Sequence, residues 1–123
     1  MKFLCYTLGD DSAGFPTPSQ EMFDEIDKLI QSAFESGIMV ATGGLALSAT
    51  GTKIVNKGGR MTVTDGPFAE TKEIVGGFAL IDVPSKEDAV EWTKRFLAIA
   101  GEGETTIREY FGPDEQYPFA GAN

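Results

Sequence analysis

The chain has 123 residues, of which 41% are hydrophobic and 24% charged, and its formal net charge is −9. This length fits one domain whose core is large enough to fold without disulfides or a metal, and the hydrophobic content excludes a disordered chain. Such an acidic surface repels phosphate backbones, so we expect no direct binding to nucleic acid.

The sequence contains no histidine and one cysteine, Cys5. The usual general base near neutral pH and the commonest zinc ligand are therefore missing, and catalysis would depend on Asp, Glu, Lys, Tyr, Arg or Cys5. One cysteine cannot form an internal disulfide, which favours a cytoplasmic location. No acidic cluster has metal-ligand spacing and no glycine pair forms a phosphate loop, so we predict neither a metal nor a cofactor.

The N-terminal apolar run is too short for a signal peptide. No stretch approaches the ~20 apolar residues that a membrane-spanning helix needs. We therefore expect no association with a membrane.

The hydrophobic pattern predicts two helices among six strands. Thr17 is the predicted N-cap of the first helix, with Pro18 at the first helical position and Gly37 after its end. Ser85 is the predicted N-cap of the second helix, which stops near the glycines at 101 and 103. The predicted strands span residues 2–8, 38–47, 52–56, 60–64, 74–83 and 104–111.

The order of these elements predicts an α+β, ferredoxin-like βαββαβ fold with an inserted β-hairpin, whose turn is Asn56-Lys57-Gly58-Gly59. Two helices would cover one face of an antiparallel sheet. The central strands are apolar on both faces, so something must cover the other face as well. A second copy of the chain is the economical answer, which predicts a homodimer.

One stretch has an unusual composition, with an Asp-Gly-Pro turn, an aromatic residue and then alternating charged and polar residues: Asp65-Gly66-Pro67-Phe68-Ala69-Glu70-Thr71-Lys72-Glu73. It resembles the signature of the DGPF family within the YCII-related proteins. The strand at 2–8, the segment Gly43-Gly44-Leu45 and the run 76–84 resemble that family in the same order. The resemblance covers about residues 1 to 112 and leaves 113–123 as a C-terminal tail, which we expect to pack on the dimer partner.

This resemblance implies a ferredoxin-like domain that pairs into a dimeric α/β barrel. Members of the family are mostly uncharacterised small bacterial proteins, often associated with sigma factors, so the resemblance also makes a sigma factor an expected partner. Some YCII-type relatives carry a candidate His–Asp pair, whose histidine this chain lacks. Enzymes of the wider barrel superfamily act on small carbonyl compounds or lactones, and a small acidic or carbonyl metabolite is the ligand class that this analogy suggests.

Three charged residues are the candidate catalytic groups. Asp65 is interpreted either as the acceptor of an Asx-turn, with Pro67 opening a short helical turn, or as a residue that also lines a ligand pocket. Glu70 and Lys72 either belong to a solvated turn of balanced charge or act as base and electrophile at the barrel rim.

A second set of residues is predicted to bind the ligand. Arg108, between the aromatic side chains of Tyr6 and Tyr110, could bind the carboxylate of a ligand. An acidic side chain at the barrel rim would satisfy Arg108 equally well. Cys5 is interpreted as an inert core residue. The predicted ligand-binding residues are Tyr6, Gly44, Phe68, Arg108 and Tyr110.

Two functions follow from these residues. The first is a homodimeric module that binds a small molecule or has a regulatory role. The alternative is an enzyme of lyase or isomerase type, in which Asp65 or Glu70 is the base and Lys72 or Arg108 stabilises an oxyanion.

Overall fold

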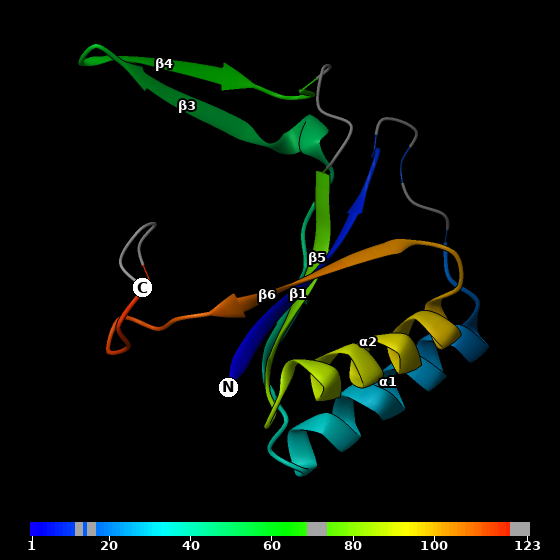
Figure 1. Cartoon of the computed structure of the whole chain (residues 1–123). Helices are drawn as coiled ribbons and strands as arrows, with labels where there is room; N and C mark the ends of the chain where they lie inside the picture. Colours follow the sequence, from blue (N-terminus) through cyan, green and yellow to red (C-terminus); the bar gives the residue numbers. More distant parts are fainter. Residues whose placement is uncertain (12–13, 15–16, 69–73, 119–123) are drawn as a thin grey trace.

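The computed structural model describes residues 1–11, 14, 17–68 and 74–118. Four antiparallel strands form the main sheet in the order β2-β5-β1-β6 (Figure 1). β1 (Lys2–Gly9) lies in the middle, between β5 (Ile74–Asp82) and β6 (Glu104–Tyr110). β2 (Met39–Gly44) forms the edge beside β5. The alternation of apolar residues therefore predicted the strands correctly, and β2 alone ends clearly earlier than predicted.

Two helices, α1 (Gln20–Glu35) and α2 (Lys86–Ala100), lie together on one face of this sheet (Figure 1). The core fills the seam between the two layers, and Ile81 of β5 is completely buried there. This arrangement confirms the predicted α+β, ferredoxin-like fold. The other buried apolar residues of the core are Phe3, Cys5, Leu29, Ala33, Met39, Ala79, Val83, Ala89 and Trp92.

The caps explain where each helix begins. The Met22 amide donates to Ser19 Oγ at 3.1 Å, so Ser19 is the N-cap of α1, and the prediction of Thr17 was wrong by two residues. Ser85 caps α2 as predicted: its Oγ accepts from the Asp88 amide at 3.2 Å and donates to the Asp88 carboxylate at 2.7 Å. Such caps satisfy amides that have no partner inside the helix.

A buried contact holds the chain that follows β2. The Asp11 carboxylate, only 6% exposed, accepts hydrogen bonds from the Ser48 amide at 2.6 Å and the Ser48 hydroxyl at 2.7 Å. Ser48 begins a short 3-10 helix, η1 (Ser48–Thr50). A buried carboxylate must be satisfied in this way because its desolvation is costly.

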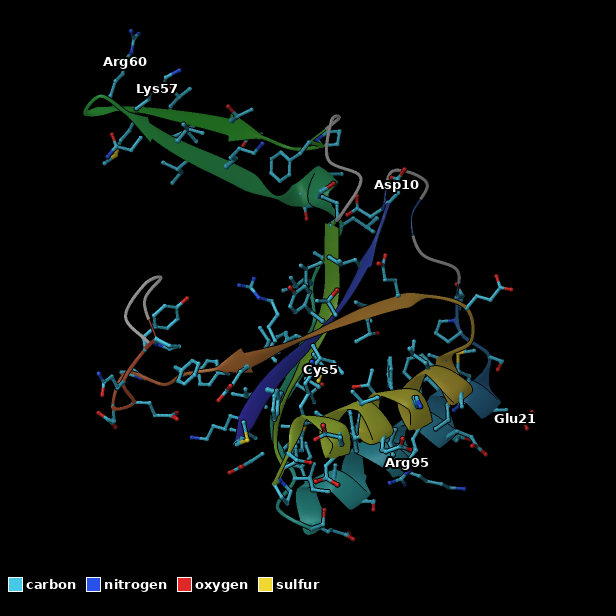
Figure 2. The ribbon with its side chains drawn as sticks, viewed as in Figure 1. Cys5, Asp10, Glu21, Lys57, Arg60 and Arg95 are labelled. Carbon is cyan, nitrogen blue, oxygen red and sulfur yellow. The ribbon has the colours of Figure 1, made fainter. Side chains whose placement is uncertain are left out.

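The predicted hairpin forms a separate two-stranded sheet of β3 (Thr52–Lys57) and β4 (Arg60–Asp65). Gly58 and Gly59, with φ of +60° and +82°, make the tight turn that glycines favour. All residues of the two strands are exposed, and the hairpin extends from the sheet on the side away from the helices (Figure 1). Lys57 and Arg60 lie at its tip (Figure 2).

The connection after β4 depends on a glycine. The Gly66 amide donates to the Gly51 carbonyl at 2.8 Å, and a Cβ on Gly66 would overlap the Ser48 carbonyl. The Gly66–Pro67 peptide bond is cis. Pro67 and Phe68 have no regular structure, and the rest of the helical turn that was expected to open at Pro67 lies outside the described residues.

We predict that Gly66→Ala lowers the free energy of unfolding by about 1–3 kcal/mol, because the added methyl group forces the Ser48 backbone to move. Chemical denaturation measures this change. The control is Gly103→Ala, since a Cβ there meets no atom within 4 Å. Equal effects of the two substitutions would show that the Ser48 contact does not constrain this connection.

Candidate ligand-binding site

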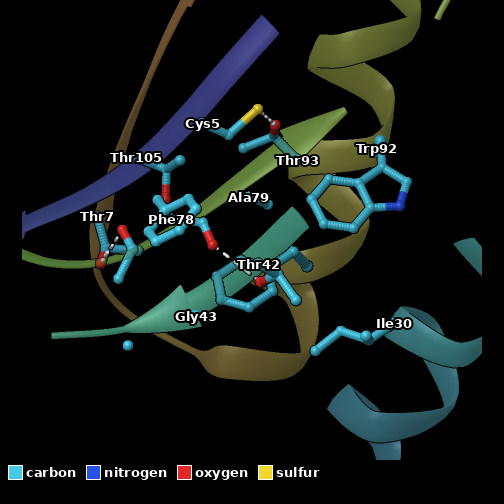
Figure 3. A pocket seen from close by; sticks show the side chains of 13 residues that line it. Cys5, Thr7, Ile30, Thr42, Gly43, Phe78, Ala79, Trp92, Thr93 and Thr105 are labelled. Atoms are coloured by element: carbon cyan, nitrogen blue, oxygen red, sulfur yellow. Dashed lines mark hydrogen bonds between the residues drawn. The ribbon is translucent and has the colours of Figure 1, made fainter. Parts of the chain in front are cut away.

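A cavity of about 320 Å³ lies between the helices and the sheet (Figure 3). All four strands of the main sheet contribute to its floor. Trp92, Thr93 and Phe96 of α2, with Ile30 of α1, form the opposite wall. The Trp92 and Phe96 rings stack with their centroids 6.3 Å apart. The site is therefore a hollow in the seam that otherwise holds the core.

The strand register explains why this seam is hollow. It aligns Gly44 with Gly77, Gly77 with Thr7, and Thr7 with Thr105, so one row crosses all four strands. This row faces the helices, because side chains alternate along a strand and Cys5, two residues before Thr7, is buried there. Two residues of the row have no side chain and two have short ones. The helices cannot fill the space that remains.

The next row toward the core is also built from small residues. Thr42, Ala79 and Cys5 stand side by side on β2, β5 and β1. The Thr42 hydroxyl donates to the Phe78 carbonyl at 2.8 Å (Figure 3). Gly77 additionally permits close strand contact, because a Cβ there would lie 3.3 Å from the Gly43 carbonyl oxygen. Glycine inside a strand often marks such a close approach of two backbones.

The hydroxyl groups of the cavity differ in their hydrogen bonding. Thr7 donates to the Gly77 carbonyl at 3.4 Å, and Thr93 donates to the Ala89 carbonyl at 2.8 Å. Thr105 Oγ1 is buried and has no hydrogen-bond partner in the described part of the chain. An unpaired buried hydroxyl is costly, and a ligand in the cavity could satisfy it. None of the described residues that line the cavity carries a charge.

Cys5 also lines the cavity. Burial raises the pKa of the Cys5 thiol above its ordinary value, and the hydrogen bond from Thr93, whose Oγ1 lies 3.7 Å from Cys5 Sγ, opposes this effect. The thiol is therefore neutral near pH 7. A neutral, buried thiol is a poor nucleophile, in agreement with its interpretation as an inert residue.

The structure places the sequence-predicted ligand residues in three regions. Gly44 lines the cavity. Tyr6, Arg108 and Tyr110 share the face of the sheet that the helices leave open. Phe68 is half-buried at the base of the hairpin, where its ring packs near Gly51 and below the Lys53 ammonium, 4.8 Å from the ring centroid.

Of the three catalytic candidates, only Asp65 belongs to the described residues, and it does not line the cavity. Asp65 is exposed at the end of β4, where its Oδ1 accepts from Thr52 Oγ1 at 3.0 Å. The expected Asx-turn at Asp65 does not form, because its donor would be the amide of residue 67, and Pro67 has no N–H. Glu70 and Lys72 lie outside the described residues, and their roles stay predictions. Among the described residues, no three His, Cys, Asp or Glu side chains gather as a metal site would require.

Sequence reasoning missed the importance of three threonines, Thr7, Thr93 and Thr105. A signal was present, because two glycine pairs fall in separate predicted strands and short polar residues alternate with apolar ones in strands 2–8 and 104–111. What was missing was the register that brings these residues into one row.

Comparisons with known proteins show the family of this chain. Residues 1–111 match the family model of the YCII-related domain. A curated relative, the uncharacterised protein R00369 of Rhizobium meliloti (strain 1021), is 27% identical over 92 residues, which cover 74% of each chain. The chain therefore belongs to the YCII-related family, and the narrower assignment to its DGPF group stays a prediction. No helix in the described ranges has the length and apolar character to cross a membrane.

We predict that Cys5 makes the fold less stable at alkaline pH. Burial holds the folded-state pKa of the thiol above its unfolded-state pKa. The neutral thiol makes its full contribution to the free energy of unfolding below the unfolded-state pKa. This contribution is lost as the pH rises from the unfolded-state pKa to the folded-state pKa. Denaturation of the wild type and of Cys5→Ala from neutral to alkaline pH should show a steeper loss in the wild type. Parallel curves would contradict this expectation.

Proposed function

We propose that this member of the YCII-related family binds one small, neutral, mostly apolar molecule in the cavity between its helices and its sheet. The observation that carries the proposal is the unpaired Thr105 hydroxyl in an apolar cavity of about 320 Å³. Small-molecule sites are typically apolar hollows of this size or larger, with a few polar groups that fix the ligand's orientation.

The lining favours a carbonyl compound over an acid. A carboxylate would lose its hydration in the cavity without meeting a cation among the described lining residues, which is strongly unfavourable. A neutral carbonyl oxygen needs only one donor, and the Thr105 hydroxyl can supply it. Of the two ligand classes that the family resemblance suggested, the small carbonyl compound is therefore the better fit.

The same lining favours binding over catalysis. The cavity has no ionised base among its described residues, and Asp65 lies on the exposed hairpin. The lyase or isomerase alternative would need Glu70 or Lys72 to serve this site. A sigma factor stays a predicted partner, and no feature of the cavity supports it.

We also propose that two copies of the chain associate through the open face of the sheet. Leu4, Tyr6, Val75 and Phe78 line a second hollow there, whose surface is entirely apolar. They lie on the neighbouring strands β1 and β5, opposite the helices. A contiguous apolar surface of this kind is typical of an interface, and twofold homodimers are the commonest soluble assemblies.

The cavity predicts which substitutions weaken binding. A thermal-shift screen of small neutral aldehydes, ketones and lactones, with matched carboxylates, should select neutral compounds. Thr105→Val keeps the side-chain shape but removes the hydroxyl, so the Kd of a selected compound should rise about fivefold to tenfold, as for the loss of one hydrogen bond. Calorimetric titration measures this change.

The matched control is Thr106→Val, the same substitution at the next residue of β6, on the opposite face of the sheet. It should leave the Kd unchanged. Gly44→Leu should abolish binding by filling the cavity, and the backbone tolerates a Cβ there because its nearest neighbour, the Gly76 carbonyl oxygen, lies 3.8 Å away. Preferential binding of carboxylates, or equal effects of the two threonine variants, would overturn the proposed site.

A further inference from the structure

The hairpin β3–β4 has two different faces. Cross-strand pairing places Ile54 opposite Val63, and Met61 lies on the same face, two residues before Val63. These three side chains are 65%, 65% and 69% exposed, respectively. The opposite face carries the basic residues Lys53, Lys57 and Arg60, together with Val55, Thr62 and Thr64. The hairpin is therefore amphipathic, with an apolar face and a basic face.

No described residue covers the apolar face. All residues of β3 and β4 are exposed, and a lone two-stranded hairpin is marginally stable in water. An exposed apolar strand face is also an aggregation hazard. Burying this face against another surface would remove both problems.

Charge favours a second copy of the chain as that surface. The hairpin, residues 52–65, holds three of the ten basic residues of the chain but only one of its nineteen acidic residues. It is net positive, whereas the rest of the chain is strongly negative. The hairpin of one copy is therefore attracted to the body of another. A second copy also offers an apolar surface, the hollow lined by Leu4, Tyr6, Val75 and Phe78.

The direction of the hairpin fits the same partner. It projects on the side of the sheet away from the helices (Figure 1). The hollow lies on the same side, because Leu4 and Tyr6 face away from the helices. Each strand has six residues, or about 20 Å at ~3.3 Å per residue. Such a projection reaches beyond its own sheet. Two copies placed with their open faces together would present their hairpins to each other.

We propose that the hairpin is an arm, and that the apolar face formed by Ile54, Met61 and Val63 packs on the open sheet face of a second copy. The inference rests on the homodimer proposed above and adds a defined interaction surface to it. Twofold symmetry exchanges two arms, one from each copy. The basic face of each arm stays in solvent.

Photo-crosslinking tests the contact directly in the full-length chain. Benzoylphenylalanine replaces Ile54 on the apolar face or, as the control, Val55 on the basic face of the same strand. Irradiation should give a covalent dimer from position 54, with the link mapped to the strands that carry Leu4, Tyr6 and Phe78. Position 55 should give none. A dimer that yields no link from position 54 would overturn the arm.

Matched valine substitutions measure the contribution of the arm. Val63→Asp places a charge on the apolar face, and Val55→Asp places the same charge on the basic face of the neighbouring strand. Sedimentation velocity over a dilution series should show a dimer Kd raised about tenfold or more by Val63→Asp, as for a residue central to an interface, and little changed by Val55→Asp.

The outcomes separate the two proposals. Equal effects of the valine variants in a protein that remains a dimer would overturn the arm and leave the sheet interface intact. A wild-type chain that is monomeric at all concentrations would overturn both the homodimer and the arm. Neither result would affect the ligand cavity, which lies on the other face of the sheet and is tested by the threonine pair.

Discussion

The structure depends on one constraint: the main sheet has two apolar faces, and the helices cover only one of them. β1 is paired on both sides, so its residues alternate between those faces. Phe3 and Cys5 are buried under the helices, whereas Leu4 and Tyr6 face away from them and are half-buried. Burial of apolar surface is the main favourable term in folding. A partner that bound to the uncovered face would therefore bury more apolar surface and stabilise the fold further.

The face of the sheet that the helices cover is incompletely packed. Protein cores are normally as dense as organic crystals, and a void forfeits contacts. Here the row Gly44, Gly77, Thr7 and Thr105 leaves the helices without opposing side chains. A fold under selection for stability alone would favour larger residues at these positions. A hollow that also holds an unpaired hydroxyl is better explained by a bound molecule than by packing.

The sequence predicted what local rules control and missed what register controls. Alternation of apolar residues located the strands, and Ser85 identified the start of α2. The end of β2 was predicted too late, and the contact between Asp11 and Ser48, 37 residues apart, follows from no local pattern. The cavity was missed because it exists only after four strands align, with a register shift in β1 between Thr7 and Leu8. No single segment contains that information.

The stretch that begins at Asp65 now has a physical explanation for its first half. Ser48 is fixed by Asp11, its carbonyl excludes any side chain at Gly66, and Gly66 is bonded to Gly51. Both ends of the hairpin are thereby held at one place against the body of the protein. A short projection attached at two such points has a defined direction, whereas one attached by flexible linkers would not. Gly66 and its neighbours therefore orient the hairpin, so that its apolar face keeps one direction relative to the body of the protein.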